Sequence, residues 1–233
     1  GIRTLANLNM TAAGRHSIYV WLEDAAGNTY YRNWGLASNA FLYDPTPPLI
    51  TATLQPALPP SSWYNVPVTV TLTASDWGGA AGSGLAAVAR RLDTGPWITS
   101  TVTPVAVPIT GADGPHTLYF RARDVAGNMT TERTLVINLD RTSPTVGDLT
   151  LNGTVAAPGS GWYVSPVTVT VPAADPTPGS GNPTVWKKLD PAPSFTAGQT
   201  FTVYPEGVHT VRAYAVDAAG NVGPTRIYTD AIK

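Results

Sequence analysis

The chain has 233 residues, of which 12% are charged and 43% hydrophobic, and its formal net charge is −1. Without a run of Lys or Arg, this composition excludes nucleic acid and anionic membrane surfaces as expected partners, and no apolar stretch approaches the roughly 18 residues of a membrane helix. The absence of Cys excludes disulfides and thiolate metal sites.

The first predicted strands lie in HSIYVWLEDAAGN, residues 16–28. The same block returns as HTLYFRARDVAGN at 116–128 and as HTVRAYAVDAAGN at 209–221, so all three histidines occupy one equivalent position. Such self-similarity indicates tandem domains. Residues 1–44 contain only the back half of a repeat and close in the strand and linker FLYDPTPP at 41–48. We expect this half repeat to be the C-terminal half of an incomplete domain.

A complete repeat, the middle repeat, is predicted over residues 45–140. In WYNVPVTVTLTASD at 63–76, apolar residues alternate with threonines, which is typical of a strand with one buried face. The residues on that face are Val68, Val70, Leu72 and Ala74. In the block at 116–128, the same alternation places on one face His116, Leu118, Phe120, Ala122 and Asp124.

The Asp-x-Ala-Gly-Asn sequence that ends this block is typical of a β-hairpin. Its Asp can accept backbone N–H groups in an Asx turn, and its Gly can adopt the positive φ that a tight turn needs. His116 and Asp124 cannot form a catalytic dyad, because eight residues along a strand span about 26 Å. We expect each His to pack at the edge of the core and to hydrogen bond a neighbouring loop.

The last repeat is predicted over residues 141–233. WYVSPVTVTVPAAD at 162–175 matches the segment at 63–76, and GSGNPTVWKKLD at 179–190 matches GSGLAAVARRLD at 82–93. The buried face of its first long strand is expected to hold Val167, Val169, Val171 and Ala173. Short strands with Gly and Pro turns, in units of about 95 residues, predict an all-β fold of tandem immunoglobulin-like (Ig-like) antiparallel β-sandwiches.

Four ordered segments of the middle repeat carry a family resemblance. They are WY-x-x-PVTVTLTASD, GSGL…RLDTGPW, G-x-HTLYFRARDVAGN and a closing strand that ends in LDRTSPT. Together they resemble the bacterial Ig-like repeat of very large secreted and cell-wall proteins. The resemblance implies an extracellular or cell-surface location and a role as spacer, stalk or appendage, so it indicates an architecture more than an activity.

Carboxylates at the ends of predicted strands form the candidate metal site. In an Ig-like sandwich, the loops after two of the strands and the entry of the first strand lie at one end of the domain, where three acids would converge. The two groups are Asp44, Asp76 and Asp124 for the middle repeat and Asp140, Asp175 and Asp217 for the last repeat. Such oxygen ligands suit calcium, and the arrangement resembles the linker sites that stiffen calcium-dependent repeat adhesins. In the alternative interpretation, each Asp only caps a turn.

Tryptophans form a second candidate site. Trp77 in a Gly-rich loop, Trp97, and Trp21 and Trp34 in the half repeat could stack on the sugar rings of a surface polysaccharide. The repeats differ here, because the counterpart of Trp77 is Pro176. Burial in an interdomain or intermolecular contact is the alternative.

The half repeat raises a question about partners. Isolated, it would leave unpaired strand edges, which native proteins cover. Either the missing strands belong to an upstream segment, or an identical chain donates them and a filament results.

The sequence therefore predicts a non-enzymatic, extracellular structural segment of a stalk, surface layer or fibre, in which Ig-like repeats of the same or identical chains are the partners. It requires no cofactor, and calcium is its candidate ligand. The alternative is a ligand-binding accessory module, for cell adhesion or carbohydrate, on a larger surface protein or hydrolase. No nucleophile, base and orienting group recur together in the repeats, so catalysis is not expected.

Overall fold

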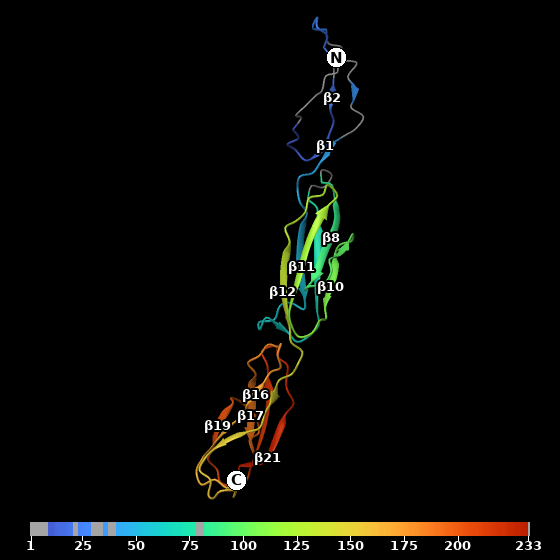
Figure 1. Cartoon of the computed structure of the whole chain (residues 1–233). Helices are drawn as coiled ribbons and strands as arrows, with labels where there is room; N and C mark the ends of the chain where they lie inside the picture. Colours follow the sequence, from blue (N-terminus) through green and yellow to red (C-terminus); the bar gives the residue numbers. More distant parts are fainter. Residues whose placement is uncertain (1–8, 21–22, 29–34, 37–40, 78–81, 233) are drawn as a thin grey trace. The chain divides into compact units, whose positions relative to one another are not determined.

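The structure of the chain is a computed structural model, which describes residues 9–20, 23–28, 35–36, 41–77 and 82–232. All regular elements of the described residues are β-strands (Figure 1). Within those residues, no helix is long and apolar enough to cross a membrane. The all-β class predicted from the alternating patterns is therefore confirmed.

The strands are short, as the frequent Gly and Pro turns require. In the half repeat and the middle repeat they are β1 (Gly14–His16), β2 (Tyr19–Val20), β3 (Gly35–Leu36), β4 (Phe41–Tyr43), β5 (Leu49–Gln55), β6 (Trp63–Tyr64), β7 (Val68–Ser75), β8 (Leu85–Leu92), β9 (Ile98–Ser100), β10 (Val105–Ile109), β11 (Gly114–Asp124) and β12 (Arg133–Leu139). In the last repeat they are β13 (Thr145–Val146), β14 (Thr150–Asn152), β15 (Val167–Thr170), β16 (Ala173–Ala174), β17 (Thr184–Leu189), β18 (Thr196–Ala197), β19 (Thr200–Val203), β20 (His209–Val216) and β21 (Arg226–Ile232).

The chain divides into two compact units. The first comprises Gly1–Thr53, Val70–Val107 and Leu118–Leu135, and the second comprises Leu54–Thr69, Pro108–Thr117 and Val136–Lys233. Several strands of the middle repeat, such as β5 and β7, therefore contribute residues to both units. The predicted segments 1–44, 45–140 and 141–233 stay a prediction.

The middle repeat has two sheets, with strand orders β10-β7-β5 and β6-β12-β11-β8-β9. The predicted alternation is confirmed along β7, where Val70 and Leu72 are fully buried, Thr71 between them is half-buried and Thr73 is exposed. It is also confirmed along β11, where Leu118 and Phe120 are buried. One pairing is parallel: Asn138 of β12 lies opposite Trp63 of β6. β7 and β11 thus each bury one face, as a sandwich requires.

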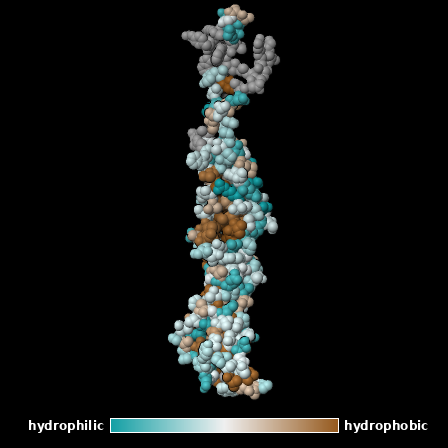
Figure 2. Space-filling model, turned by 90° about the vertical axis from the view of Figure 1, so that its left-hand side faces the viewer, coloured by the Kyte–Doolittle hydropathy of each residue, from teal (hydrophilic) through white to brown (hydrophobic). Residues whose placement is uncertain are grey.

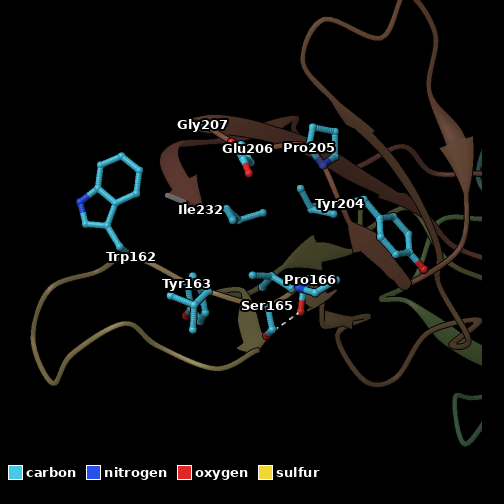
Figure 3. Close-up of a pocket in the computed structure, with 12 residues that line it drawn as sticks. Trp162, Tyr163, Ser165, Pro166, Tyr204, Pro205, Glu206, Gly207 and Ile232 are labelled. Atoms are coloured by element: carbon cyan, nitrogen blue, oxygen red, sulfur yellow. Dashed lines mark hydrogen bonds between the residues drawn. The ribbon is translucent and has the colours of Figure 1, made fainter.

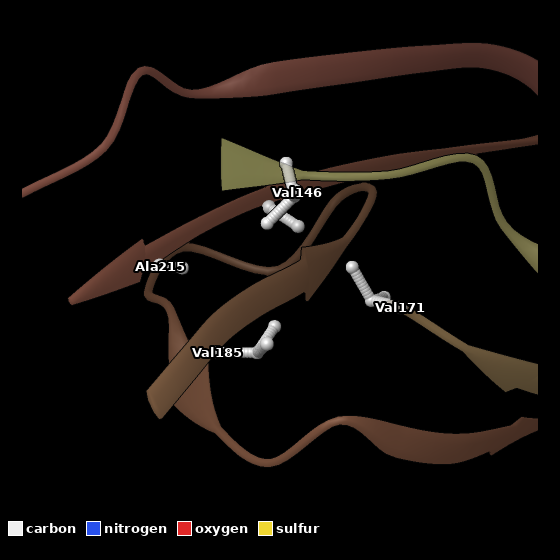
Figure 4. Close-up of a cluster of buried hydrophobic side chains, with 5 residues drawn as sticks. Val146, Val171, Val185 and Ala215 are labelled. Carbon is white, nitrogen blue, oxygen red and sulfur yellow. The ribbon is translucent and has the colours of Figure 1, made fainter. Parts of the chain in front are cut away.

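The last repeat is an antiparallel β-sandwich that lies within the second unit. Its larger sheets have the orders β14-β15-β19 and β18-β17-β20-β21, and β13 pairs with β16. One core cluster joins the two larger sheets, because Val169 of β15 and Val203 of β19 pack with Val211 of β20 and Ile232 of β21. A second cluster contains Val146, Val171, Val185, Ala213 and Ala215 (Figure 4). Apolar side chains from both sheets therefore form the core of this Ig-like sandwich.

The predicted continuous strand over 167–173 is wrong in one respect. In the last repeat it ends at Thr170, and the chain resumes as β16, which pairs with β13 in a different sheet. Pro172 lies at the break, where it has no N–H group to donate to a ladder. In the middle repeat Thr73 stands at this position, and β7 runs unbroken from Val68 to Ser75.

The described part of the half repeat consists of two small antiparallel sheets. β1 pairs with β4, and β2 pairs with β3. Several apolar side chains on these strands are exposed, namely Tyr19, Phe41, Leu42 and Tyr43. On the face drawn in Figure 2, apolar surface is gathered into separate patches between hydrophilic ones.

Candidate metal centre

The structure brings the six predicted acids together as two groups of three. The first trio is Asp44, Asp76 and Asp124, which follow β4, follow β7 and end β11. The second trio is Asp140, Asp175 and Asp217, which follow β12, β16 and β20. In each trio, one carboxylate oxygen per residue lies within 4.8 Å of the others. Metal binding at either trio stays a prediction.

Backbone N–H groups hold the first two carboxylates of the first trio. Asp44 accepts the Thr46 N–H at 3.1 Å through Oδ1 and the Ser83 N–H at 2.7 Å through Oδ2. Asp76 accepts the Gly84 N–H at 2.7 Å through Oδ2. The Ser-Gly pair that precedes β8 therefore orients both side chains.

The hairpin after β11 supplies the third carboxylate. Asp124 Oδ1 accepts the Asn128 N–H at 2.7 Å, which confirms that this Asp accepts a backbone N–H of its own turn, although the bond reaches four residues on and not the two of an Asx turn. The Asn128 amide donates to Asp124 Oδ2 at 2.8 Å and to the Asp44 carbonyl at 2.7 Å. The Ala126 N–H donates to the Ser83 hydroxyl at 3.0 Å. Hairpin, incoming linker and Ser83 are thereby joined in one network.

The second trio repeats this network bond for bond. Asp140 takes the place of Asp44, Asp175 that of Asp76, and Asp217 that of Asp124. Four backbone bonds recur: Thr142 N–H and Ser180 N–H to Asp140, Gly181 N–H to Asp175, and Asn221 N–H to Asp217. The bridging bonds recur as well: the Asn221 amide to Asp217 and the Asp140 carbonyl, and Ala219 N–H to the Ser180 hydroxyl.

One oxygen in each trio is buried without a hydrogen-bond donor. It is Oδ1 of Asp76 in the first trio and Oδ1 of Asp175 in the second. A buried acceptor without a partner costs free energy and needs an explanation. Space around Asp175 is tight, because a Cβ on Gly179 would lie 3.0 Å from Asp175 Oδ2 and 2.6 Å from the Pro176 carbonyl.

The local electrostatics disfavour the ionised form of one carboxylate, Asp175 of the second trio. Burial raises the pKa of the Asp175 carboxyl, and the nearby Asp140 and Asp217 carboxylates raise it further, although the Gly181 N–H opposes this. In the first trio, the pKa of Asp44 is lowered, chiefly because the Ser83 N–H donates to its ionised form. The side-chain donors of the two networks are neutral amides and, at Asp44, the Ser83 hydroxyl, so they orient the carboxylates without neutralising their charge.

The donor set fits a hard divalent cation. Calcium takes six to eight oxygen ligands in flexible geometry, from carboxylates, carbonyls and water. Each trio can give a calcium ion at least three carboxylate oxygens, and more where a carboxylate binds through both oxygens. This is about half of the coordination shell. A site without imidazole or thiolate favours calcium over zinc or copper.

The half repeat contains the same hairpin, which belongs to no group of three acids among the residues that the structure describes. Asp24 accepts the N–H groups of Ala26 and Asn28, both at 2.9 Å, and the Asn28 amide at 2.9 Å. The pKa of Asp24 is lowered, chiefly because the Asn28 amide donates to its carboxylate. Turn capping therefore accounts for the hairpin itself, while the convergence with two further acids is a separate feature of the two complete repeats.

The three histidines behave as the sequence predicts. Their Nε2 atoms each hydrogen bond the carbonyl four residues earlier, which belongs to the loop before the strand. The pairs are His16 with Ala12 at 2.7 Å, His116 with Ala112 at 2.8 Å and His209 with Pro205 at 3.1 Å. This repeated bond gives each ring a structural role.

Two of the four tryptophans of the predicted sugar platform, Trp77 and Trp97, lie among the described residues, and sugar binding stays a prediction. Trp77 is 68% exposed and lies beside the first trio in sequence, after Asp76. The Trp97 ring is covered by the guanidinium groups of Arg91, 5.2 Å from its centroid, and Arg121, at 4.6 Å. A ring engaged in cation–π contacts offers little free face to a sugar. Trp21 and Trp34 lie outside the described residues.

The linker after β12 is also bound by the loop before β11. Arg141 Nε donates to Asp113 Oδ1 at 3.1 Å, and its Nη2 donates to the Gly111 carbonyl. The Thr142 hydroxyl donates to Asp113 Oδ2. The Thr142 hydroxyl, and to a smaller degree Arg141, lower the pKa of Asp113.

We expect Asp113→Asn to destabilise the chain at neutral pH by no more than about 1 kcal/mol, since the pair is partly exposed. A carboxyl with a lowered folded-state pKa stabilises the fold above its unfolded pKa and loses that contribution as the pH falls through the folded pKa. The wild-type chain and Asp113→Asn should therefore differ in urea unfolding at pH 7 and converge well below the usual Asp pKa of 3.8. A constant difference across this range would contradict the assignment.

Some solved structures are similar to the chain, at 17% and 19% sequence identity for the two described below. No family model matches the chain, and no curated protein matches it. The chain is similar to the fibronectin(III)-like modules of CbhA from Clostridium thermocellum, with TM-score 0.38 and 17% identity, covering 76% of this chain and 91% of that one. It is also similar to a Ca2+-stabilized adhesin that helps an Antarctic bacterium reach out and bind ice, with TM-score 0.36 and 19% identity, covering 94% of this chain and 57% of that one. Because both TM-scores are below 0.5, the fold rests on this chain's own strand pairing.

Proposed function

We propose that this chain is a non-catalytic structural segment of a bacterial extracellular or cell-surface protein, in which Ig-like repeats form a stalk, surface layer or fibre. The observation that carries the proposal is the recurrence of one hydrogen-bond network at two trios of acids. In both trios, the network includes an Asp that enters a repeat from the preceding linker, Asp44 or Asp140. In a spacer, a contact of this kind at each linker would fix the linker to the repeat that follows it.

Calcium at these trios would supply the positive charge that the carboxylates lack. The chain's own groups do the positioning: Ser83 and Ser180 orient the linker carboxylates, and Asn128 and Asn221 tie the hairpins to the linker carbonyls. A bound cation would therefore act on a linker that is already aligned. The expected consequence is a stiffer joint and a more stable repeat.

The histidine contacts support a role without catalysis. Each ring hydrogen bonds a carbonyl of its own preceding loop, in all three repeats. A general base must instead reach a substrate and be oriented by a further group. Binding of polysaccharide by an accessory module is the alternative function, and the exposed indole of Trp77 is the observation that favours it.

Thermal unfolding tests the proposal. In 10 mM calcium we expect a melting temperature several degrees higher than in EDTA, because this concentration is about 10–100 times the dissociation constant of an extracellular calcium site and stabilises the native state by about 1.4–2.7 kcal/mol. Magnesium at the same concentration, which demands stricter octahedral geometry, is the control and should have a smaller effect. Equal melting temperatures in calcium, magnesium and EDTA would contradict calcium binding and favour the interpretation in which each of the six acids only caps a turn. Sedimentation in the same buffers tests filament formation, for which the exposed apolar side chains of β4 are the candidate contact.

A further inference from the structure

Three arginines lie on the outer face of the larger sheet of the middle repeat. Tyr119 of β11 lies opposite Arg91 of β8, so their side chains share the face that points away from the core. Arg121 and Arg123 follow on the same face of β11 at steps of two residues, each of which spans about 7 Å along a strand. Arg91, Arg121 and Arg123 therefore form a row along the strands, which we call the arginine row. All three belong to the first unit.

Aromatic rings hold two of these guanidinium groups in place. The Arg91 Cζ atom lies 4.2 Å from the centroid of the Tyr119 ring and 5.2 Å from the centroid of the Trp97 ring. The Arg121 Cζ atom lies 4.6 Å from the same Trp97 centroid. Cation–π contacts of this kind restrict side chains that otherwise have many rotamers. A ligand that binds these two groups therefore loses less side-chain entropy than one that binds free arginines.

The arginine row has no carboxylate beside it on its own two strands. The residues of β8 and β11 on this face are Ala87, Ala89, Arg91, Thr117, Tyr119, Arg121 and Arg123. Within the described part of the chain, neither Arg91 nor Arg121 forms an ion pair, and the Nε atom of each is buried without a hydrogen-bond acceptor. A charged donor without an acceptor costs free energy. An anion at the terminal N–H groups of the two side chains would offset part of that cost.

The corresponding face of the last repeat has a similar composition. Lys188 of β17 lies opposite Arg212 of β20, and the Lys188 Nζ atom lies 5.1 Å from the centroid of the Phe195 ring. Val216 stands at the position of Arg123, so two cations take the place of three. We therefore expect the middle repeat to offer the stronger site for an anion.

The groove of the last repeat has the opposite charge. It is lined by Trp162 to Val167 on one side and by Val203 to Gly207 on the other, and Figure 3 shows Ile232 between Tyr163 and Glu206. Among the described residues that line this groove, Glu206 is the only charged one. An anionic ligand is therefore not expected there, and its binding would report on the arginine row.

We propose that the arginine row binds a linear polysaccharide that carries carboxylate groups. A carboxylate accepts two parallel N–H groups of one guanidinium, and cations at steps of about 7 Å match a polymer with repeated charges better than a single ion. β8 and β11 are interior strands of their sheet, so they offer no free edge to the strand of an acidic peptide. The Trp97 ring is already covered by guanidinium groups, which disfavours stacking of nucleic acid bases. This binding function goes beyond the proposed structural role and does not require calcium.

Titration of the full chain with a uronic acid oligosaccharide, in EDTA at low ionic strength, tests the proposal. The readouts are the affinity and the Nε–H resonances of Arg91 and Arg121. We expect both resonances to shift and Arg121→Ala to bind about fivefold more weakly than the wild type. Arg121→Lys keeps the charge but loses the planar fork, so it should also bind more weakly. Arg15→Ala, which removes an exposed charge from the half repeat, is the matched control and should bind like the wild type.

Three results would overturn the proposal. One is equal affinity of the wild type, Arg121→Ala and Arg121→Lys. Another is a lower melting temperature of the Arg121 variants with unchanged affinity, which would show that the cation–π contacts serve only the stability of the sheet. The third is binding of neutral dextran, a poly-glutamate peptide or an oligothymidylate as tight as that of the uronic acid oligosaccharide. Because no residue of either acidic trio belongs to the arginine row, failure here would leave the calcium proposal standing.

Discussion

Asp175→Asn should raise the melting temperature of the chain in EDTA and lower it in millimolar calcium, relative to the wild type. Without a cation, the substitution removes one of three converging carboxylates, and its amide can donate to Asp140 or Asp217. Relief of like-charge repulsion between partly exposed groups is worth about 1 kcal/mol. With calcium at 100 times its dissociation constant, the wild type gains about 2.7 kcal/mol that the variant lacks, so the variant is less stable by a net difference of about 2 kcal/mol, or several degrees.

The stability difference between Asp175→Asn and the wild type in EDTA should also depend on pH. Because the folded-state pKa of Asp175 is raised, the native state takes up a proton first, and its stability grows as the pH falls from above the folded pKa toward the unfolded pKa. The advantage of Asp175→Asn should therefore be largest at neutral pH and shrink on mild acidification. Asp76→Asn is the matched variant in the first trio. A variant less stable than the wild type in both EDTA and calcium would show that the carboxylate serves only as a cap.

Asn221→Ala should destabilise the last repeat by about 2–4 kcal/mol, with or without calcium. The Asn221 amide donates to the Asp217 carboxylate at 2.8 Å and to the Asp140 carbonyl at 2.9 Å. The first bond involves a charged acceptor and the second a neutral one, and both acceptors are on residues less than 7% exposed. Chemical denaturation in EDTA measures the loss.

Asn28→Ala is the control for the hairpin, because within the described residues the same amide there bonds the exposed Asp24, at 2.9 Å, and no linker carbonyl. We expect a change within about 0.5 kcal/mol. Equal losses for Asn28→Ala and Asn221→Ala would contradict the role of Asn221 as a tie between hairpin and linker.

The repeated periodicity made the fold predictable. Alternation at Val68 to Ala74 and at Leu118 to Ala122 specifies which face is buried, since a shift by one residue would expose every apolar side chain. The Asp-x-Ala-Gly-Asn turn was equally readable, because Gly127 and Gly220 have φ of +101° and +92°, which side chains disfavour. The convergence of the six acids followed from knowing which ends of the strands meet in an Ig-like sandwich.

Other features depend on tertiary contacts that no local pattern specifies. Ser83 and Ser180 bridge the linker carboxylates to the hairpins, and their only signal was the recurring Gly-Ser-Gly before β8 and β17. The different surroundings of Trp63 and Trp162 could not be predicted, because the two WY segments match in sequence. Among the described residues, the first segment pairs with the strand that closes its repeat and the second does not. Pro172 in the sequence indicates a possible break in the strand. It does not indicate that the chain after the break, β16, pairs with β13 in a different sheet.

Direct measurement of calcium stoichiometry tests the central claim most directly. Equilibrium binding should show two ions per chain, one for each trio of acids, with dissociation constants of about 10⁻⁴–10⁻³ M. Asp76→Asn and Asp175→Asn should each lower the stoichiometry to one, and the double variant should bind none. Undiminished binding in the double variant, or no binding by the wild-type chain at 10 mM calcium, would contradict the assignment of these carboxylates as a calcium site.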